Sequence, residues 1–278
     1  MKLRANADAI AAIIAADTGD EPPSVMKPLY IRRNAFDVDL AASIYRIVPL
    51  DHLLEDITHA QLTHTRISLY KTGDSSENPL LNRAFPDPVT GDTLTLNGAV
   101  ENMFASCWSV IPLDGTGDWA SFSHGLPSVR IESSAGQLLM AAMSESNPYY
   151  SLQHAIGKVH YFPEEELEAY FSDPDYSKHL DGLGHGIHVS LMRLGTDMQP
   201  ETEVRLVYDF MPLEPWVRQN VCLVEEHVKV PFDWRDTIRS IVVGPFVRSG
   251  GQKVAEHKFQ ELGIVCPIST SVTRAYSG

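Results

Sequence analysis

QPETEVRLVYDF, residues 199 to 210, has the alternation of a strand and carries charge along one side. Val204 and Leu206 are apolar, whereas Glu201, Glu203 and Arg205 are charged. Because successive side chains of a strand point to opposite faces, the two glutamates and the arginine share one face. The stretch therefore predicts a strand with an apolar side that joins a core and a second side lined by acid, acid and base.

Strands and helices surround this stretch in an irregular order. Strand patterns occur at residues 43–49, 64–70, 104–112, 119–125, 127–133, 156–162, 222–232, 241–246 and 265–272. Helix patterns occur at residues 9–16, 35–43, 50–62, 136–145, 163–171, 233–240 and 251–263. Such an order favours an α+β fold, with mixed, mostly antiparallel sheets and packed helices, over a doubly wound sheet. We expect residues 1–40 to form a helical arm and linker, and residues 41–278 a single α+β domain.

Composition and charge narrow the class of protein. Of the 278 residues, 44% are hydrophobic and 21% are charged, which is typical of a globular protein. The net charge of −14 disfavours nucleic acid and anionic membrane as tight partners unless a local basic patch overrides it. The short apolar run at residues 9–16 lies between two aspartates, so we interpret it as an amphipathic helix and not as a signal peptide or membrane span. Three widely spaced cysteines predict a reduced, cytoplasmic protein.

Several motifs along the chain follow the order of a known bacterial family. They are IYRIVPLDHLLEDI (44–57), SSENPLLN (75–82), SCWSV (106–110), DWASFSHGLPSVRI (118–131), GKVHYF (157–162) and ETEVRLV (201–207). From about Tyr45 to the C-terminus the chain resembles the bacterial domain-of-unknown-function family 2971. It departs from that family in the loop before Asn78, which lacks a tryptophan and an acidic pair. A second departure follows Trp119, where no aromatic–glycine pair stands.

The order of the polar motifs is also similar to the arginine–serine–glutamate order of ADP-ribosyltransferases. Arg46 would take the first role, Ser106 or Ser109 the second, and Glu203 the third, with Glu201 beside it. The gap between the serine strand and the glutamates is longer here than in compact transferases. The resemblance implies a split sheet, NAD as substrate, and NAD glycohydrolase or ADP-ribosyltransferase activity, as in a toxin or defence effector.

The resemblance also implies a chemical role for each charged residue. Cleavage of the nicotinamide–ribose bond passes through an oxocarbenium-like state, which the Glu203 carboxylate would stabilise. Glu201, on the same face, would activate an acceptor or a water. The planar guanidinium of Arg46 would donate two hydrogen bonds to the oxygens of a diphosphate.

The uncharged candidates would complete a nucleotide site. Ser106 or Ser109 would support the ribose or orient Glu203 through a hydroxyl hydrogen bond. Tyr45 or Trp119 would stack on the nicotinamide ring. The partner expected from this set is a small-molecule nucleotide, with a protein or a nucleic acid as acceptor.

Each of these residues also has a structural interpretation. The Glu-x-Glu-x-Arg pattern is common on solvent-facing strands that pair charges across a ladder, and tryptophans are common in cores. Cys107 could act as a nucleophile with His124, but a lone strand cysteine is usually a small buried side chain. The histidines have no carboxylate or cysteine in a ligand pattern with them, so we expect no metal site. The alternatives to an enzyme acting on NAD are a non-catalytic module that binds a nucleotide or a protein, and a hydrolase built on the histidines.

Overall fold

The computed structural model describes residues 6–17, 19, 21–69, 78–87, 90–173, 185–195, 202–247 and 250–273. The helices in these ranges are α1 (Ala7–Ala16), α2 (Pro23–Arg33), α3 (Leu50–Thr58), α4 (Asn97–Val100), α5 (Thr116–Ser123), α6 (Ala135–Ala142), α7 (Tyr150–Gln153), α8 (Glu164–Phe171), α9 (His185–Leu191), α10 (Pro215–Asn220) and α11 (Gly251–Glu261). The strands are β1 (Ala35–Phe36), β2 (Ser43–Pro49), β3 (Gln61–Arg66), β4 (Ala84–Pro86), β5 (Thr93–Thr95), β6 (Met103–Ser109), β7 (Ser128–Ser134), β8 (His154–Lys158), β9 (His160–Phe162), β10 (Arg193–Gly195), β11 (Glu203–Asp209), β12 (Cys222–Val224), β13 (His227–Pro231), β14 (Ser240–Val243) and β15 (Ile268–Thr270).

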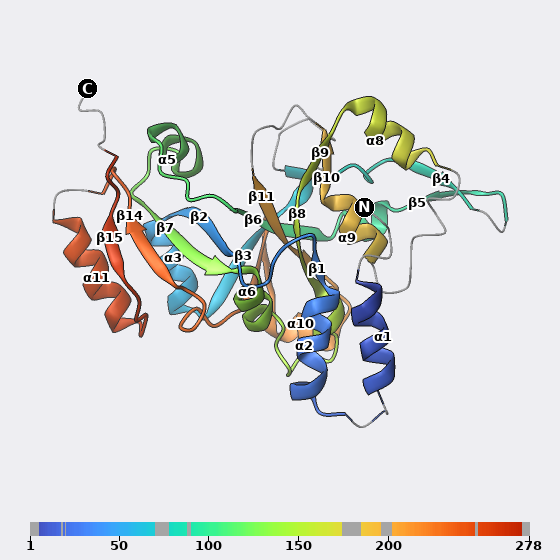
Figure 1. Ribbon diagram of the computed structural model, residues 1–278, viewed down its shortest axis with the longest axis horizontal. Helices are drawn as coiled ribbons and strands as arrows, with labels where there is room; N and C mark the ends of the chain where they lie inside the picture. Colours follow the sequence, from blue (N-terminus) through green and yellow to red (C-terminus); the bar gives the residue numbers. More distant parts are fainter. Residues whose placement is uncertain are drawn as a thin grey trace.

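One large sheet organises the chain. Its strand order is β1-β8-β11-β6-β2-β7-β14-β15, and β3, β13 and β12 branch from it beside β6. Most neighbouring strands are antiparallel, whereas β1 with β8 and β14 with β15 are parallel. The helices lie around the sheet in no regular alternation with the strands (Figure 1). The structure thus confirms the α+β fold with a mixed, mostly antiparallel sheet.

The sheet divides where β2 meets β6. β2 pairs with β7 along its whole length but with β6 only at Tyr45 and Ser109. Further along, the same edge of β6 pairs with β3 instead. In Figure 1 one half, with β2, β7, β14 and β15, lies beside α5 and α11, and the other half, with β6, β11 and β8, lies below α8. This division matches the split sheet that the resemblance implies.

The two faces of β11 differ in their contacts, and we name them after one residue each. On the Leu206 face, Val204, Leu206 and Tyr208 join the main hydrophobic core. On the Glu203 face, Val207 joins a second core with β9, β10 and α8, while Glu203 and Arg205 precede it along the strand. The strand therefore buries both faces, although only one of them has a purely apolar pattern.

Within the segment expected to form an arm and a linker, α2 and β1 contact the rest of the chain. Ile31 of α2 is buried in the main core, and β1 pairs with β8 through Ala35 and Phe36. Residues 35–43 were predicted as a helix, but this pairing holds their first two residues extended. No helix in the described part of the chain is long and apolar enough to cross a membrane.

The strand predicted at residues 119–125 is helical in the structure. α5 begins at Thr116, and the Asp118 carboxylate accepts a hydrogen bond from the backbone N–H of Gly115, which caps the first turn. The buried side chains of α5 are Trp119 and Ser123, which lie four residues apart, as on one face of a helix. Residues 233–240, predicted to start a helix, form a turn that leads into β14.

Gly244 is fitted against the Trp119 ring, and we expect Gly244→Ala to destabilise the protein by about 1–3 kcal/mol. A Cβ at this position would lie 2.5 Å from Cζ3 of Trp119 and 2.8 Å from the carbonyl oxygen of Ser128. Trp119 is fully buried, so the ring has no space into which to move. Urea unfolding measures the effect. Gly117→Ala in α5, where a Cβ meets nothing within 4 Å, is the matched control, and equal unfolding midpoints for the two variants would contradict the packing argument.

Candidate functional site

Three of the candidate residues lie in one row across the point where the sheet divides. Tyr45 of β2 is paired with Ser109 of β6, and Ser109 is paired with Glu203 of β11. Directly opposed residues point to the same face, so these three side chains share the Glu203 face. The row continues through Glu132 of β7 to Ser240 of β14. Five neighbouring strands thus place polar side chains in line on one face, which hydrophobic packing alone does not explain.

Glu203 and Arg205 form a buried ion pair at one end of this row. Nε of Arg205 donates to Oε1 of Glu203 at 2.6 Å, and the two side chains are only 1% and 5% exposed. Arg205 also donates to the backbone carbonyl of Leu191. Glu203 and Arg205 of the Glu-x-Glu-x-Arg motif are therefore buried, and they do not pair charges on a solvent-facing strand.

The surroundings of Glu203 keep its carboxylate ionised. Burial acts to raise the pKa of Glu203, but the charge and hydrogen bond of Arg205 lower it, as do hydrogen bonds from Cys107 and Tyr161. The net effect is a pKa below the ordinary value. A carboxylate that is negative at neutral pH and largely desolvated is a strong electrostatic partner for a cationic reacting centre.

Tyr161 and Cys107 were missed as neighbours of Glu203 by the sequence analysis. The Tyr161 hydroxyl, from β9, donates to Oε2 of Glu203 at 3.2 Å. Cys107 lies opposite Arg205 on β6, and its side chain hydrogen-bonds to Glu203. The GKVHYF and SCWSV motifs contain both residues, but no spacing rule connects them to residue 203.

Ser109 is held beside Glu203 by local hydrogen bonds. Its hydroxyl lies 3.0 Å from that of Thr202 and accepts the backbone N–H of Ile111 at 3.1 Å. The backbone N–H of Val110 also donates to the carbonyl of Thr202. These bonds tie the end of β6 to the start of β11 and fix the register that brings Ser109 to Glu203.

Arg46 and Ser106 lie on the opposite face. Arg46 follows Tyr45, so alternation turns it to the Leu206 face, where its guanidinium lies 6.0 Å from the Trp108 ring centroid. Ser106 is paired with Leu206 and accepts a hydrogen bond from the indole N–H of Trp108 at 3.3 Å. The structure therefore does not bring the Arg46 guanidinium or the Ser106 hydroxyl to the Glu203 carboxylate.

The two remaining candidates are placed differently. Trp119 is fully buried against Gly244, and its indole N–H donates to Asp114 at 3.0 Å. Its ring has no open face on which a nicotinamide would stack. Glu201 lies outside the described residues.

Two buried histidines, His64 and His154, lie on the Leu206 face. The rings of His64 and His154 pack with Tyr208, and the centroids of His154 and Tyr208 are 4.8 Å apart. His188 is buried in α9. Burial lowers the pKa of His154 to about 3, and burial with neighbouring positive charges lowers that of His188 to about 3. Within the described ranges no group of three or more histidine, cysteine or acidic side chains is arranged to hold a metal ion.

These histidines make stability depend on pH. A neutral buried histidine must take up its proton on unfolding, so its stabilising contribution is complete above the unfolded pKa near 6.5 and is lost as the pH falls toward 3. We expect His154→Leu to reduce the difference in unfolding free energy between pH 7 and pH 5 by about 2 kcal/mol. Urea titrations at both pH values measure it. His52→Asn, on the exposed side of α3, should leave the difference unchanged, and a similar change in both variants would contradict the assignment to His154.

Comparison with known proteins gives only distant likenesses. No protein-family model and no curated protein matches the chain, so the resemblance to family 2971 stays an expectation. Three solved structures of DarT from Thermus sp. 2.9 are similar to it: the complex with carba-NAD+ (13% identity, TM-score 0.34, covering 82% of this chain and 94% of that one), the complex with NAD+ (12%, 0.33, 84% and 96%) and the complex with ADP-ribosylated ssDNA (12%, 0.36, 86% and 97%). Likeness at this level assigns no activity, so function is argued from the chain's own residues.

Proposed function

We propose that the chain cleaves the nicotinamide–ribose bond of NAD, as an NAD glycohydrolase or ADP-ribosyltransferase, with Glu203 as the essential carboxylate. The observation that carries the proposal is the row of Tyr45, Ser109 and Glu203 at the division of the sheet. It joins an aromatic ring, a hydroxyl and an ionised carboxylate on one face. Of the Arg–Ser–Glu order in the sequence, Ser109 and Glu203 lie in this row, whereas Arg46 lies on the other face.

The chemistry gives Glu203 and Ser109 distinct roles in cleaving the bond. Nicotinamide leaves with the electron pair of the carbon–nitrogen bond, and positive charge develops on the anomeric carbon and ring oxygen of the ribose. The Glu203 carboxylate stabilises this charge, and Ser109 orients the ribose. The half-buried Tyr45 ring lies two strands along the row, beyond Ser109 as seen from Glu203. Water or an acceptor nucleophile then bonds to the anomeric carbon and releases its proton to solvent.

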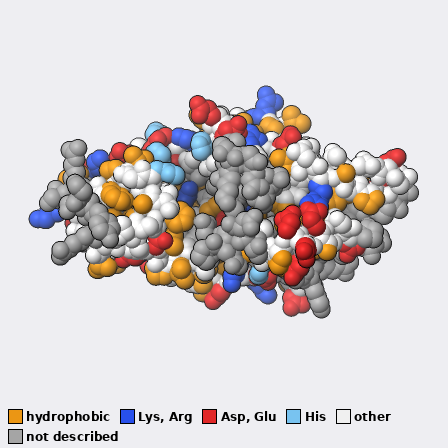
Figure 2. All heavy atoms as spheres, turned by 90° about the horizontal axis from the view of Figure 1, so that it is seen from above, with side chains coloured by type: hydrophobic (Ala, Val, Ile, Leu, Met, Phe, Trp, Pro, Cys, Tyr) orange, Lys and Arg blue, Asp and Glu red, His pale blue; other side chains and the backbone are white. Residues whose placement is uncertain are grey.

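The charge around the site restricts the acceptor. Figure 2 shows acidic side chains gathered to the right of the centre of the upper surface, and the first turn of α8 carries Glu164, Glu165 and Glu166. α8 begins shortly after Tyr161, so a nucleic-acid acceptor would have to approach Glu203 from a direction away from these charges. Water and a protein acceptor meet no such restriction.

Release of nicotinamide tests the proposal. Purified protein is incubated with NAD, alone and with a cell extract as the source of acceptors, and free nicotinamide is followed by chromatography. We expect release above the uncatalysed background, with ADP-ribose as co-product if water is the acceptor. Absence of release under both conditions would contradict the enzymatic function.

A non-catalytic nucleotide-binding module is the second candidate, and one observation favours it. Both oxygens of the Glu203 carboxylate already accept hydrogen bonds, from Arg205 and Tyr161. A carboxylate used in this way can hold the site together without taking part in a reaction. Calorimetric binding of NAD without any nicotinamide release would identify this function.

A further inference from the structure

We infer that Arg130, together with Tyr45, forms the diphosphate-binding half of the site, in the role that the sequence had suggested for Arg46. The inference rests on the proposed function for the identity of the ligand, a dinucleotide. It follows from where the sheet pairing places the basic side chains relative to Glu203.

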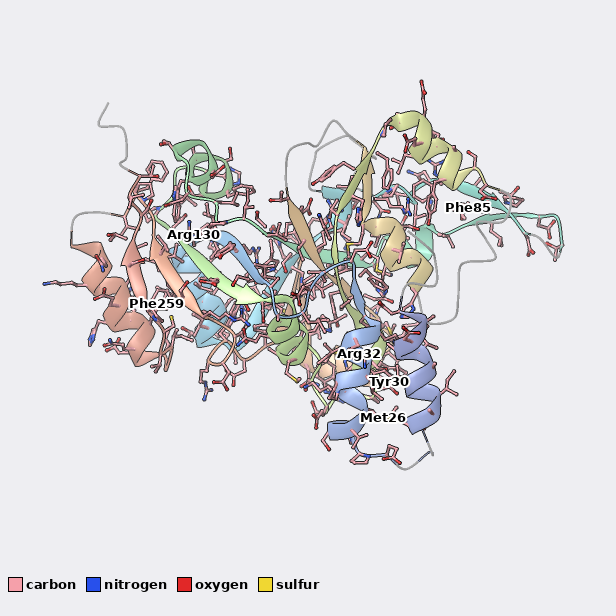
Figure 3. All side chains as sticks on the ribbon, viewed as in Figure 1. Met26, Tyr30, Arg32, Phe85, Arg130 and Phe259 are labelled. Carbon is pink, nitrogen blue, oxygen red and sulfur yellow. The ribbon has the colours of Figure 1, made fainter. Side chains whose placement is uncertain are left out.

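Arg130 stands on the Glu203 face. It is paired with Ile47 of β2, and Ile47 and Tyr45 are two residues apart on the same side of that strand. The Arg130 guanidinium lies over the Tyr45 ring, 5.7 Å from its centroid. Figure 3 shows Arg130 on the half of the sheet that lies beside α5. Arg46, by contrast, turns to the other face.

The separation from Glu203 suits a ribose and its attached diphosphate. Tyr45 is two strands away from Glu203 along the row, and neighbouring strands are about 4.8 Å apart. A cation above Tyr45 therefore lies on the order of 10 Å from the carboxylate. A ribose seated at Glu203 and Ser109 would direct its 5′-phosphate along the row toward Tyr45.

The guanidinium keeps hydrogen-bonding capacity in this position. Nη1 donates to the backbone carbonyl of Leu113 at 2.8 Å and lies 3.7 Å from Asp114. Within the described residues no hydrogen bond uses Nε or Nη2 of Arg130. These remaining N–H groups form the planar edge that binds two phosphate oxygens at once.

Two carboxylates near Arg130 are already satisfied by other donors. Asp114 accepts hydrogen bonds from Trp119 and Ser271. Glu132 accepts the hydroxyls of Ser43 and Ser240 at 2.6 Å each. If Arg130 binds a diphosphate, both carboxylates therefore keep their other hydrogen-bond donors.

Calorimetry with ADP-ribose, which contains the diphosphate but cannot be cleaved at a nicotinamide bond, tests the inference. We expect Arg130→Gln to weaken ADP-ribose binding about 10- to 100-fold, because a charged hydrogen bond is lost. Arg46→Gln, the matched control on the other face, should change it by less than about 3-fold. Arg130→Lys keeps the charge but not the fork and should fall between them. Thermal unfolding confirms that each variant is folded.

The outcomes separate this inference from the proposed function. Loss of affinity in Arg46→Gln but not in Arg130→Gln, equal loss in both, or no ADP-ribose binding by the wild type would each overturn the inference. Binding that depends on Arg130 without nicotinamide release would refute the enzyme and leave the anion site standing. Nicotinamide release with an unchanged KM in Arg130→Gln would refute only the inference.

Discussion

Glu203→Gln is expected to reduce nicotinamide release from NAD by at least about 100-fold, without a matching loss of NAD binding. The substitution removes the negative charge that would face the oxocarbenium-like state, while the amide keeps an oxygen to accept from Arg205 at Oε1. An interaction made mainly in the transition state lowers kcat when it is removed and leaves ground-state binding largely intact. Steady-state kinetics of nicotinamide release, with calorimetry for binding, measure both quantities.

Glu132→Gln is the matched control for this loss. Glu132 lies in the same row of side chains, on the same face, and its carboxylate likewise accepts two hydrogen bonds. Its place on β7 puts Tyr45 and Ser109 between it and Glu203, so its removal should change kcat by less than about 10-fold. Equal losses in the two variants would show that any carboxylate in the row matters in the same way, and would contradict the specific role of Glu203. Glu203→Asp keeps the charge and should retain more activity than the amide.

The fold class was predictable from the order of strand and helix patterns, because periodicity reports which side of each element is apolar. The same reasoning correctly separated Glu203 and Arg205 from Val204 and Leu206 on β11. It could not predict the helix at α5, since a short segment with one inward tryptophan and a buried serine does not distinguish helical from strand periodicity. Nor could it show that both faces of β11 are buried, because the second core is built by β9, β10 and α8.

The candidate site was only partly predictable, and register explains why. Whether Arg46 or Tyr45 faces Glu203 depends on a single pairing between Tyr45 and Ser109, and a shift of one residue would exchange them. Motif order contains no information about register. The position of Arg130 over Tyr45 is also not predictable from motif order, because it follows from the pairing of β2 with β7. Long-range pairing, not local pattern, decides which charges meet.

The buried ion pair leads to the largest expected effect on stability. Arg205→Met leaves the Glu203 carboxylate desolvated without its countercharge, and we expect it to lower the free energy of unfolding by about 3–5 kcal/mol at pH 7. Arg235→Met removes one partner of a largely exposed pair with Asp233, and should cost less than about 1 kcal/mol. Urea unfolding of both variants gives the comparison. Similar losses would contradict the role of burial.

The pH dependence of Arg205→Met distinguishes a lost charge interaction from lost packing. In the wild type the pKa of Glu203 is lowered, so its contribution to stability is present above the unfolded pKa near 4.3 and is lost as the pH falls through the folded pKa. Without Arg205 burial dominates and raises the pKa of Glu203, so the carboxyl becomes neutral as the pH falls and the desolvation penalty disappears. The destabilisation should therefore be smaller at pH 5 than at pH 7.

Adding Glu203→Gln to Arg205→Met should recover part of the stability at pH 7, because no buried charge is then left unpaired. A loss that is independent of pH, and that the second substitution does not relieve, would mean that Arg205 contributes through packing alone.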